Sequence, residues 1–485
     1  MANITLGTLR DYWKRVYDWI GAGANPSVSV TSMPSVSASI SQVVRVTDTV
    51  SDMNIYGASW DKAATPSLTR IGKAAGMIAG AGVDFSFPVN NFDQAPIWGE
   101  ITEVVDTLGN VFIRIPKVYI RKLDGAGFRA LQVSKHRHPG FYLPACFWNF
   151  TTSAELPYVD VGKYKATKDG ANKLESKPNL YPLINTHIVD FRTFARNNNT
   201  GGLLGYQQMD IHIVDLLQTL FYIEFATLHS QSVMAGYTEG RYLATHVATV
   251  AENGVNRIIV VNAHADLYRV GQAISVGTTL GGNQVFYGRT ITAIDVYDGS
   301  NKAISFDGAA VNIAVNDVLY NTGWRNGFSS AIAASSGSLV SNSDGKYPCT
   351  YRGIESPWGD IAQWVDGVNI NERQAWVTPN AADYASNVFA SPYLQLSYAN
   401  GSMDGWVTTV GYDAAYPYAA FPAAVGGSST TFYCDSYWLA TGQIVARYGG
   451  ALETGVSAGV STWRCTMTSG GTSLMVGGRL VKKAL

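Results

Sequence analysis

The sequence predicts an α+β fold for a chain of 485 residues. One segment, residues 209–228, has strong helical periodicity, whereas many short runs elsewhere have the composition of strands. Charged residues make up only 15% of the chain, while Gly (49 residues) and Tyr (27 residues) are abundant, which is typical of rigid, β-rich proteins. The length allows about two to four domains.

The N-terminal segment is predicted to begin with a helix at residues 4–21. Four large side chains follow the 3-4-3 spacing of a coiled-coil seam: Leu9, Tyr12, Val16 and Trp19. Two turns of seam are too short to be stable alone in water, so we expect this helix to pack on copies of itself or on a larger partner. An ordinary amphipathic surface helix is the alternative.

Residues 26–46 alternate apolar side chains with Ser or Thr, which predicts extended strands with one buried face. A single strand cannot bury that face alone, so we interpret residues 1–52 as an N-terminal helix and an oligomerising stalk shared between identical chains. A flexible Ser-rich linker is the alternative.

Residues 209–228 form the strongest predicted helix. Asp210 is a suitable N-cap, and the apolar stripe consists of Leu216, Leu217, Leu220, Phe221 and Phe225. His212 and Glu224 lie off this stripe, so we interpret them as solvent-facing or polar-contact residues and not as a catalytic pair.

Residues 246–324 change in character. Short strands recur about every ten residues between Gly, Asn and Asp turns, which predicts a small all-β barrel inserted into the main domain. An insertion needs neighbouring ends, so the main domain would comprise residues 53–245 and 325–485. The second part is rich in Gly, Ser, Trp and Tyr, and we expect long ordered loops there.

Several classes of function are disfavoured by the sequence. The net charge is −1, without the clustered Lys and Arg of a nucleic-acid surface. No apolar run is long enough to span a membrane, and the N-terminus lacks the pattern of a signal peptide, so we expect synthesis in a cytoplasm without membrane insertion. Cys146, Cys349, Cys434 and Cys465 are predicted to be free, buried thiols.

Signatures of catalysis and of metal binding are weak. His136 and His138 form a His-x-His that could bind a metal if several chains contributed, but a polar loop is the favoured interpretation. Asp404 and Asp435 could form a carboxylate pair for glycoside cleavage only if they lay close together. The sequence therefore predicts no enzyme activity, no cofactor and no metal.

The stretch YRGIESPWGDIAQWVDGVNI, residues 351–370, poses the choice between an active site and a buried scaffold. Trp358 and Trp364 suit half-buried positions, and Gln363 and Asp366 can bond to neighbouring backbone. We interpret the stretch as scaffold, with a short helix held between loops.

Four C-terminal stretches together resemble one family: WGDIAQWVDG (358–367), FYCDSYWLATGQIVARYGG (432–450), ETGVSAGVSTW (453–463) and VGGRLV (476–481). They are similar to the C-type-lectin-like fold of formylglycine-generating enzymes and their non-enzymatic relatives. A closer resemblance is to phage and prophage tail proteins with this fold, related to major tropism determinants and to variable proteins diversified by retroelements. It covers residues 53–485 and implies a C-type-lectin-like domain with an inserted β domain.

The match to the enzymes lacks their cysteine. Leu480 stands where the closing motif of the oxidases has one, and Cys434 and Cys465 lie elsewhere. In the binding relatives an aromatic residue often follows the Gly-Gly, whereas this chain has Ala451 and Leu452. The resemblance therefore favours the binding members.

The implied function is recognition of a bacterial surface glycan or protein at the tip of a phage tail or fibre, as a homotrimer in the virion that attaches to other tail or baseplate proteins through residues 1–52. The implied receptor-contacting residues are Tyr433, Asp435, Tyr437, Glu453, Thr454, Ser457, Ser461, Trp463 and Met467. Trp358, Trp364, Gly449, Gly450 and Arg479 are assigned to the scaffold.

Three alternatives remain open at this stage. A structural baseplate component would bind no cells. An oxidase would require Cys434 and Cys465 to approach one another and bind a metal. A glycan-cleaving enzyme would require a close carboxylate pair.

Overall fold

The computed structural model describes residues 54–201, 204–399 and 404–485. These residues belong to one compact unit, Thr49–Leu485. The predicted N-terminal helix and stalk, residues 1–52, lie outside the described residues. In the described part no helix is both long and apolar enough to cross a membrane.

The described part of the chain is mostly β, so the prediction of an α+β class is wrong. Only three α-helices occur there: Ile188–Arg196 (α3), Ile211–Phe225 (α4) and Asn262–Ala265 (α5). The helical periodicity at residues 209–228 was interpreted correctly, but a single long helix does not set the class. Most remaining segments pair as strands, including the stretch at residues 351–370.

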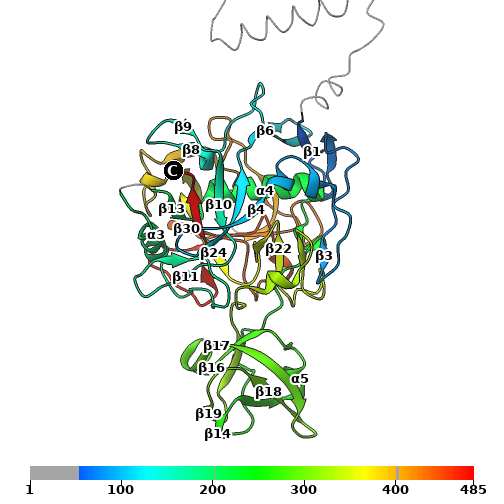
Figure 1. The fold of residues 1–485 in the computed structure, drawn as a ribbon, viewed down its shortest axis with the longest axis vertical. Helices are drawn as coiled ribbons and strands as arrows, with labels where there is room; N and C mark the ends of the chain where they lie inside the picture. The colour runs from blue at the N-terminus through cyan, green and yellow to red at the C-terminus, as the bar shows by residue number, and fades with distance from the viewer. Residues whose placement is uncertain (1–53, 202–203, 400–403) are drawn as a thin grey trace, which may run out of the picture. The chain divides into compact units, whose positions relative to one another are not determined.

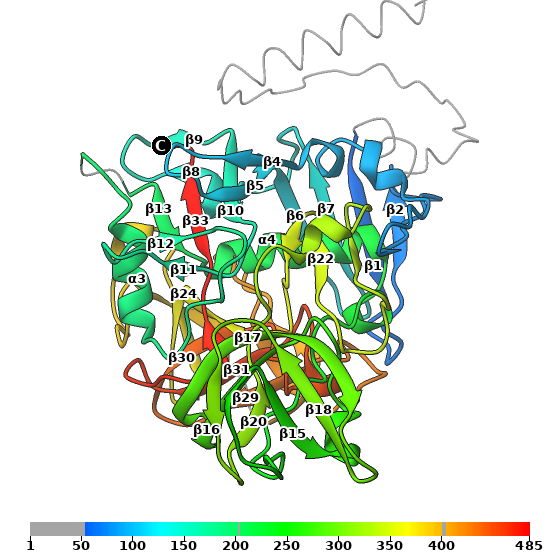
Figure 2. The same cartoon turned by 60° about the horizontal axis from the view of Figure 1, so that its bottom comes forward.

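Two antiparallel sheets are built mainly from the first part of the chain. The first has the order β2-β1-β7-β6 and the second β13-β33-β10-β5-β4. In Figure 2 the last strand of the chain, β33, lies between β13 and β10, so the C-terminus completes a sheet whose first strand in the chain, β4, begins at Thr102. The strands are Tyr56–Trp60 (β1), Thr69–Gly72 (β2), Thr102–Val105 (β4), Val111–Pro116 (β5), Tyr119–Asp124 (β6), Arg129–Ser134 (β7), Tyr158–Gly162 (β10), Tyr206–Gln208 (β13) and Leu480–Lys483 (β33).

The largest sheet collects the C-terminal strands. Its order is β26-β25-β24-β30-β31-β29-β27-β28, with β32 paired to β24. Most neighbours are antiparallel, but β29 and β31 are parallel. The strands are Ala362–Asn371 (β24), Gln374–Val377 (β25), Leu394–Ala399 (β26), Asp404–Val410 (β27), Pro422–Val425 (β28), Ser436–Leu439 (β29), Gln443–Tyr448 (β30), Trp463–Met467 (β31) and Val476–Gly477 (β32).

The other strands outside the inserted segment are short, and several 3-10 turns connect them. A four-stranded sheet of order β23-β22-β21-β3 consists of Gly82–Val83 (β3), Gly337–Ser338 (β21), Cys349–Tyr351 (β22) and Ile354–Glu355 (β23). Two small pairs are formed by Trp148–Asn149 (β8) with Ala154–Glu155 (β9), and by Thr167–Lys168 (β11) with Leu174–Glu175 (β12). The 3-10 turns are Asn91–Gln94, Trp98–Glu100, Ala145–Phe147, Ser230–Ser232, Phe328–Ala331, Ala381–Asp383 and Gly455–Ser457.

Helix α4 forms the centre of the main core. It lies behind β4 and β10 in the view of Figure 1 and contacts β1, β7 and β24. All of its residues are buried, because sheets cover the helix on every side. The predicted cap is confirmed: the Asp210 carboxylate accepts hydrogen bonds from the backbone N–H groups of His212 and Ile213. The helix ends at Ala226, which has a left-handed backbone conformation.

The two polar residues of α4 do not face solvent. His212 is fully buried, and its Nε2 lies 3.0 Å from the carbonyl oxygen of Thr378. Glu224 is also fully buried; it pairs with Arg352, and its Oε1 accepts a hydrogen bond from Asn90 at 2.9 Å. The polar-contact interpretation of these residues is confirmed, and the solvent-facing one is wrong.

Residues 252–321 form a five-stranded sheet, of order β15-β18-β17-β16-β20, with a separate core that includes Ile258, Ile274 and Phe286. The entering and leaving chains are neighbours, because Leu319 N–H bonds to His246 O and Asn321 N–H bonds to Arg241 O. Figure 1 draws the elements in green: Glu252–Val255 (β14), Arg257–Val261 (β15), α5, Ala273–Thr279 (β16), Gly282–Val296 (β17), Asn301–Phe306 (β18), Val311–Ile313 (β19) and Val318–Asn321 (β20). The domain boundaries at 246 and 324 stay a prediction.

Candidate functional site

The acidic residues of the 351–370 stretch all act inside the scaffold. Glu355 accepts a hydrogen bond from Gly327 N–H at 2.8 Å, and Asp360 accepts one from Trp324 N–H at 2.7 Å. Both carboxyl groups are almost fully buried, and burial raises their pKa values. The predicted short helix is wrong, because the second half of the stretch is strand β24 at the centre of the largest sheet.

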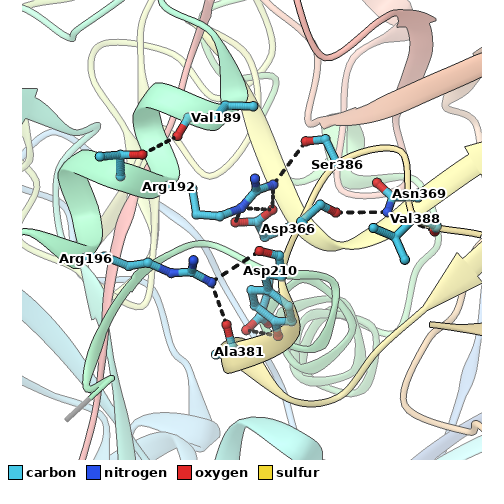
Figure 3. Close-up of polar contacts among 12 residues, drawn as sticks. Val189, Arg192, Arg196, Asp210, Asp366, Asn369, Ala381, Ser386 and Val388 are labelled. Atoms are coloured by element: carbon cyan, nitrogen blue, oxygen red, sulfur yellow. Dashed lines mark hydrogen bonds and ion pairs between the residues drawn. The ribbon is translucent and has the colours of Figure 1, made fainter. Parts of the chain in front are cut away.

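Asp366 of β24 makes a buried ion pair with Arg192 of α3, as Figure 3 shows. The Arg192 Nε lies 2.9 Å from the Asp366 Oδ2, and the two side chains are 9% and 3% exposed. Arg196, one turn further along α3, donates to the carbonyl of Ala381 at 2.8 Å. Buried pairs of this kind fix the position of one element relative to another. Because the Asp366 carboxylate is buried in this pair, a substrate cannot reach it.

The residues assigned to the scaffold are buried, and Trp358 and Trp364 are more deeply buried than the half-buried positions that the sequence predicted. Trp358 and Trp364 use their indole N–H groups to bond the carbonyls of Met234 and Thr186. Arg479, 1% exposed, donates to Gly162 O and to Glu355 O, each at 2.7 Å. These contacts connect the closing motif of the chain to the first half of the main domain.

The four cysteines are free and buried, as predicted. Burial raises the pKa of every one of these thiols, and that of Cys434 reaches about 12. The thiolate is the nucleophilic form of cysteine, so burial disfavours the reactive form of each of these thiols.

Asp404 and Asp435 do not share a cleft. Asp404 is exposed at the start of β27, whereas Asp435 is fully buried just before β29. Val407 N–H bonds to Asp435 O, which places Asp435 three positions along β27 from Asp404, or roughly 10 Å at the usual strand rise. The side chains therefore face different environments, and the pair does not form the facing carboxylates that a glycosidase needs.

The His-x-His segment lies in a surface turn. His136 is exposed, and the Nε2 of His138 lies 3.1 Å from the Ser134 Oγ. Within residues 54–201, 204–399 and 404–485, no group of three or more His, Cys, Asp or Glu side chains is arranged to hold a metal ion.

Five of the nine predicted contact residues are buried, so they cannot touch a receptor in this conformation. They are Tyr433, Asp435, Tyr437, Ser461 and Trp463, none more than 4% exposed. Successive strand residues point to opposite faces, and Tyr437 and Trp463 are on the inward face, where both pack against Phe421. The contact assignment must be corrected for these five residues.

Tyr433 lines a different part of the molecule. Its hydroxyl accepts a hydrogen bond from Arg129 at 3.3 Å, at the wall of a pocket of about 470 Å³ between α4, β7 and residues 410–420. The buried ion pair of Lys122 with Asp215 also lines this pocket.

The other four predicted residues are at the surface, and three of them line one groove. Glu453, Thr454 and Met467 lie along a groove of about 760 Å³ on the outward face of β29, β30 and β31, and Ser457 is near it in the next turn. The residues of β29, β30 and β31 in this groove that sequence reasoning missed are Trp438, Arg447, Arg464 and Thr466, and Ala362 of β24 and Val476 of β32 also line it.

Strand register brings the missed residues side by side. Trp438 of β29 is paired with Arg464 of β31, and Arg464 is paired with Arg447 of β30. The signal that could have found them is alternation: if Tyr437 and Trp463 face inward, Trp438 and Arg464 must face outward. The sequence did not show which of the two faces is covered.

A double-glycine turn places the loop beside these strands. Gly449 and Gly450 follow β30 with φ values of 88° and 74°, which favour glycine. A Cβ on Gly450 would lie 2.8 Å from the Cβ of Ala458. The Gly-Gly motif thus turns the chain sharply and positions Glu453 and Thr454 at the groove.

The polar groups of the groove are only partly satisfied. Arg464 lies over the Trp438 ring at 5.5 Å and 3.8 Å from the Glu453 carboxylate. Arg447 donates from Nη2 to Thr466 Oγ1 at 2.8 Å, but its buried Nε has no hydrogen-bond partner among the described residues. Burial, and next the charge of Arg464, lower the pKa of Arg447 to about 10.

This arrangement is suited to binding. A sheet presents an aromatic ring, two guanidinium groups and a thioether along one concave surface, with the Glu453 carboxylate at its edge. No protein-family model and no curated protein matches the chain, so the groove itself must carry any functional proposal.

Proposed function

We propose that this chain is a receptor-binding protein of a phage tail, and that the groove on β29, β30 and β31 contacts a bacterial surface molecule. The observation that carries the proposal is the convergence of Trp438, Arg464 and the loop residues Glu453 and Thr454 on one concave surface. The resemblance of the C-terminal motifs to phage tail proteins supports it.

The residue types of the groove fit recognition. Trp, Tyr, Met and Arg are enriched in binding interfaces, because they provide large contact areas and strong directional donors. The supporting sheet holds them in fixed positions, which lowers the entropy cost of binding. In the proposed homotrimer, three copies of the groove would strengthen weak single-site binding through effective concentration.

The test is binding of the fluorescently labelled full chain to a panel of bacterial cells. A truncation that removes residues 432–485 is unsuitable, because β33 is an interior strand of its sheet. Trp438→Ala is the informative variant, since this side chain is only half-buried. We expect it to weaken cell binding by at least about tenfold, or ~1.4 kcal/mol.

Phe87→Ala is the matched control, because Phe87 is a 76% exposed aromatic that does not line the groove. Equal binding by Trp438→Ala and the native chain would show that the groove is not the contact surface. Absence of binding by the native chain to every cell type would instead favour a structural baseplate role.

A further inference from the structure

The groove contains an excess of positive charge. Arg447 and Arg464 are paired residues on adjacent strands, and Glu453 is the only acidic residue among the groove-lining residues. Glu453 lies 3.8 Å from Arg464, at the outer limit of an ion pair, and both side chains are substantially exposed. A pair this loose and solvated contributes little, so it leaves Arg464 available to a ligand.

Arg447 gives stronger evidence that the groove binds an anion. It is 5% exposed and makes one hydrogen bond, to Thr466, while its Nε–H is buried without a partner among the described residues. A buried, unpaired donor is unfavourable, and a guanidinium normally pairs its planar edge with two oxygens of an anion. The unpaired Nε–H of Arg447 in the groove lining is therefore a donor suited to an anionic ligand.

The other residues of the groove indicate what kind of molecule would carry the anionic group. Arg464 lies over one face of the half-buried Trp438 ring, the rest of which offers a flat apolar surface, and Thr454 and Thr466 add hydroxyl groups to the groove. A pyranose ring has an apolar C–H face that can lie against an indole, and hydroxyl groups that can bond to Thr. An inorganic anion alone would leave the Trp438 surface uncovered.

We infer that the groove binds an acidic sugar, with its carboxylate on Arg447 and Arg464 and its ring against Trp438. The origin of that sugar in a bacterial surface polysaccharide rests on the proposed function. The chemistry of the site does not, because it follows from the two arginines and the tryptophan alone.

The test compares sugars that differ only in the carboxylate. The full chain is titrated with methyl glucuronide, methyl galacturonide and a methyl sialoside, with methyl glucoside and methyl galactoside as neutral counterparts of the first two, and binding is followed by ligand-observed NMR. We expect at least one acidic sugar to bind about tenfold or more tightly than the neutral sugars. High salt should weaken that preference, because the contact is between charges.

Arg464→Gln is the informative variant, since the Arg464 side chain is 45% exposed and its replacement should not unfold the chain. We expect this change to lower the affinity for the acidic sugar to that for its neutral counterpart. Arg464→Lys should keep only part of the preference, because lysine lacks the planar guanidinium group. Arg137→Gln, at a 65% exposed arginine outside the groove, is the matched control and should bind like the native chain.

Three results would overturn the inference: no acidic sugar bound up to about 10 mM, a range that includes weak single-site affinities; equal binding of acidic and neutral sugars; or tighter binding of inorganic phosphate than of any acidic sugar. If one of these occurs while Trp438→Ala still weakens cell binding, the receptor function stands and the ligand class falls. Acidic-sugar binding without any cell binding would mean that the ligand class stands and the receptor function falls.

Discussion

Asp435 shows how burial changes the role of one residue. Its position in a motif of the binding family made it a predicted contact, yet its side chain is fully buried and accepts a hydrogen bond from Ser461 N–H at 2.6 Å. Its other oxygen, Oδ1, has no hydrogen-bond partner among the described residues. Burial raises the pKa of this carboxyl well above its ordinary value of 3.8.

Replacement of Asp435 by Asn should therefore stabilise the protein at neutral pH. A carboxyl whose pKa is higher in the folded state holds its proton there, so its contribution to stability is complete below pH 3.8 and is lost as the pH rises toward the folded pKa. We expect Asp435→Asn to raise the free energy of unfolding at pH 7 by about 1 kcal/mol or more, and to remove part of the decline with rising pH. Urea denaturation across the pH range measures both effects.

The control is Asp404→Asn, at an exposed carboxylate that accepts a hydrogen bond from Leu439 N–H at 3.0 Å. It should change stability by less than about 0.5 kcal/mol. A loss of stability in Asp435→Asn at pH 7 would contradict the assignment of Asp435 as a buried carboxyl whose pKa is raised by burial.

At the scale of the element, α4 depends on its N-cap. Asp210 bonds two backbone N–H groups of the first turn, and its Oδ2 also accepts from Gln207 Nε2 and Tyr384 Oη, each at 2.9 Å. The cap residue thus connects the helix to β13 and to the segment after β25.

Asp210→Ala should destabilise the protein by about 2 kcal/mol or more, because it removes the cap and leaves the buried Gln207 and Tyr384 groups without an acceptor. Asp210→Asn keeps one oxygen for the helix N–H groups and should lose less. Chemical denaturation of the three proteins measures the difference. A loss below about 0.5 kcal/mol in the Ala variant would show that water replaces the cap.

At the scale of the whole molecule, distant parts of the sequence are held together by buried ion pairs. Arg192 and Asp366 are 174 positions apart and connect α3 to β24, while Glu224 of α4 and Arg352 are 128 positions apart. Such contacts explain how strands from the end of the chain become central to the fold.

Asp366→Ala should destabilise the protein by about 3–5 kcal/mol, because it leaves the Arg192 guanidinium buried without a counter-charge. Arg192→Met combined with Asp366→Leu should lose much less, since neither residue of that pair would be charged. Thermal and urea unfolding compare the variants. The surface pair of Arg137 with Glu155 supplies the control: Arg137→Met should cost less than about 1 kcal/mol. Equal losses at the two sites would contradict the structural role of the Arg192–Asp366 pair.

The local features of the chain were predictable from its sequence. Helix α4 and its Asp210 cap follow from apolar periodicity and capping chemistry, both of which act within a few residues. The free, buried thiols were also predicted correctly, whereas Trp358 and Trp364 were expected at half-buried positions and are fully buried. The class was not, because most strands of this chain are short, and even the ten-residue strand β24 looks like a loop or a helix until its partners are known.

The candidate groove was also only partly predictable from the sequence. The sequence alone determined that residues 453–467 contain surface positions, and Glu453, Thr454 and Met467 are at the groove. Only the tertiary structure decided that Trp438, Arg447 and Arg464 lie side by side and that Tyr437 and Trp463 face the core. The physical reason is that a strand has two faces, and which one is exposed depends on what the rest of the chain packs against it.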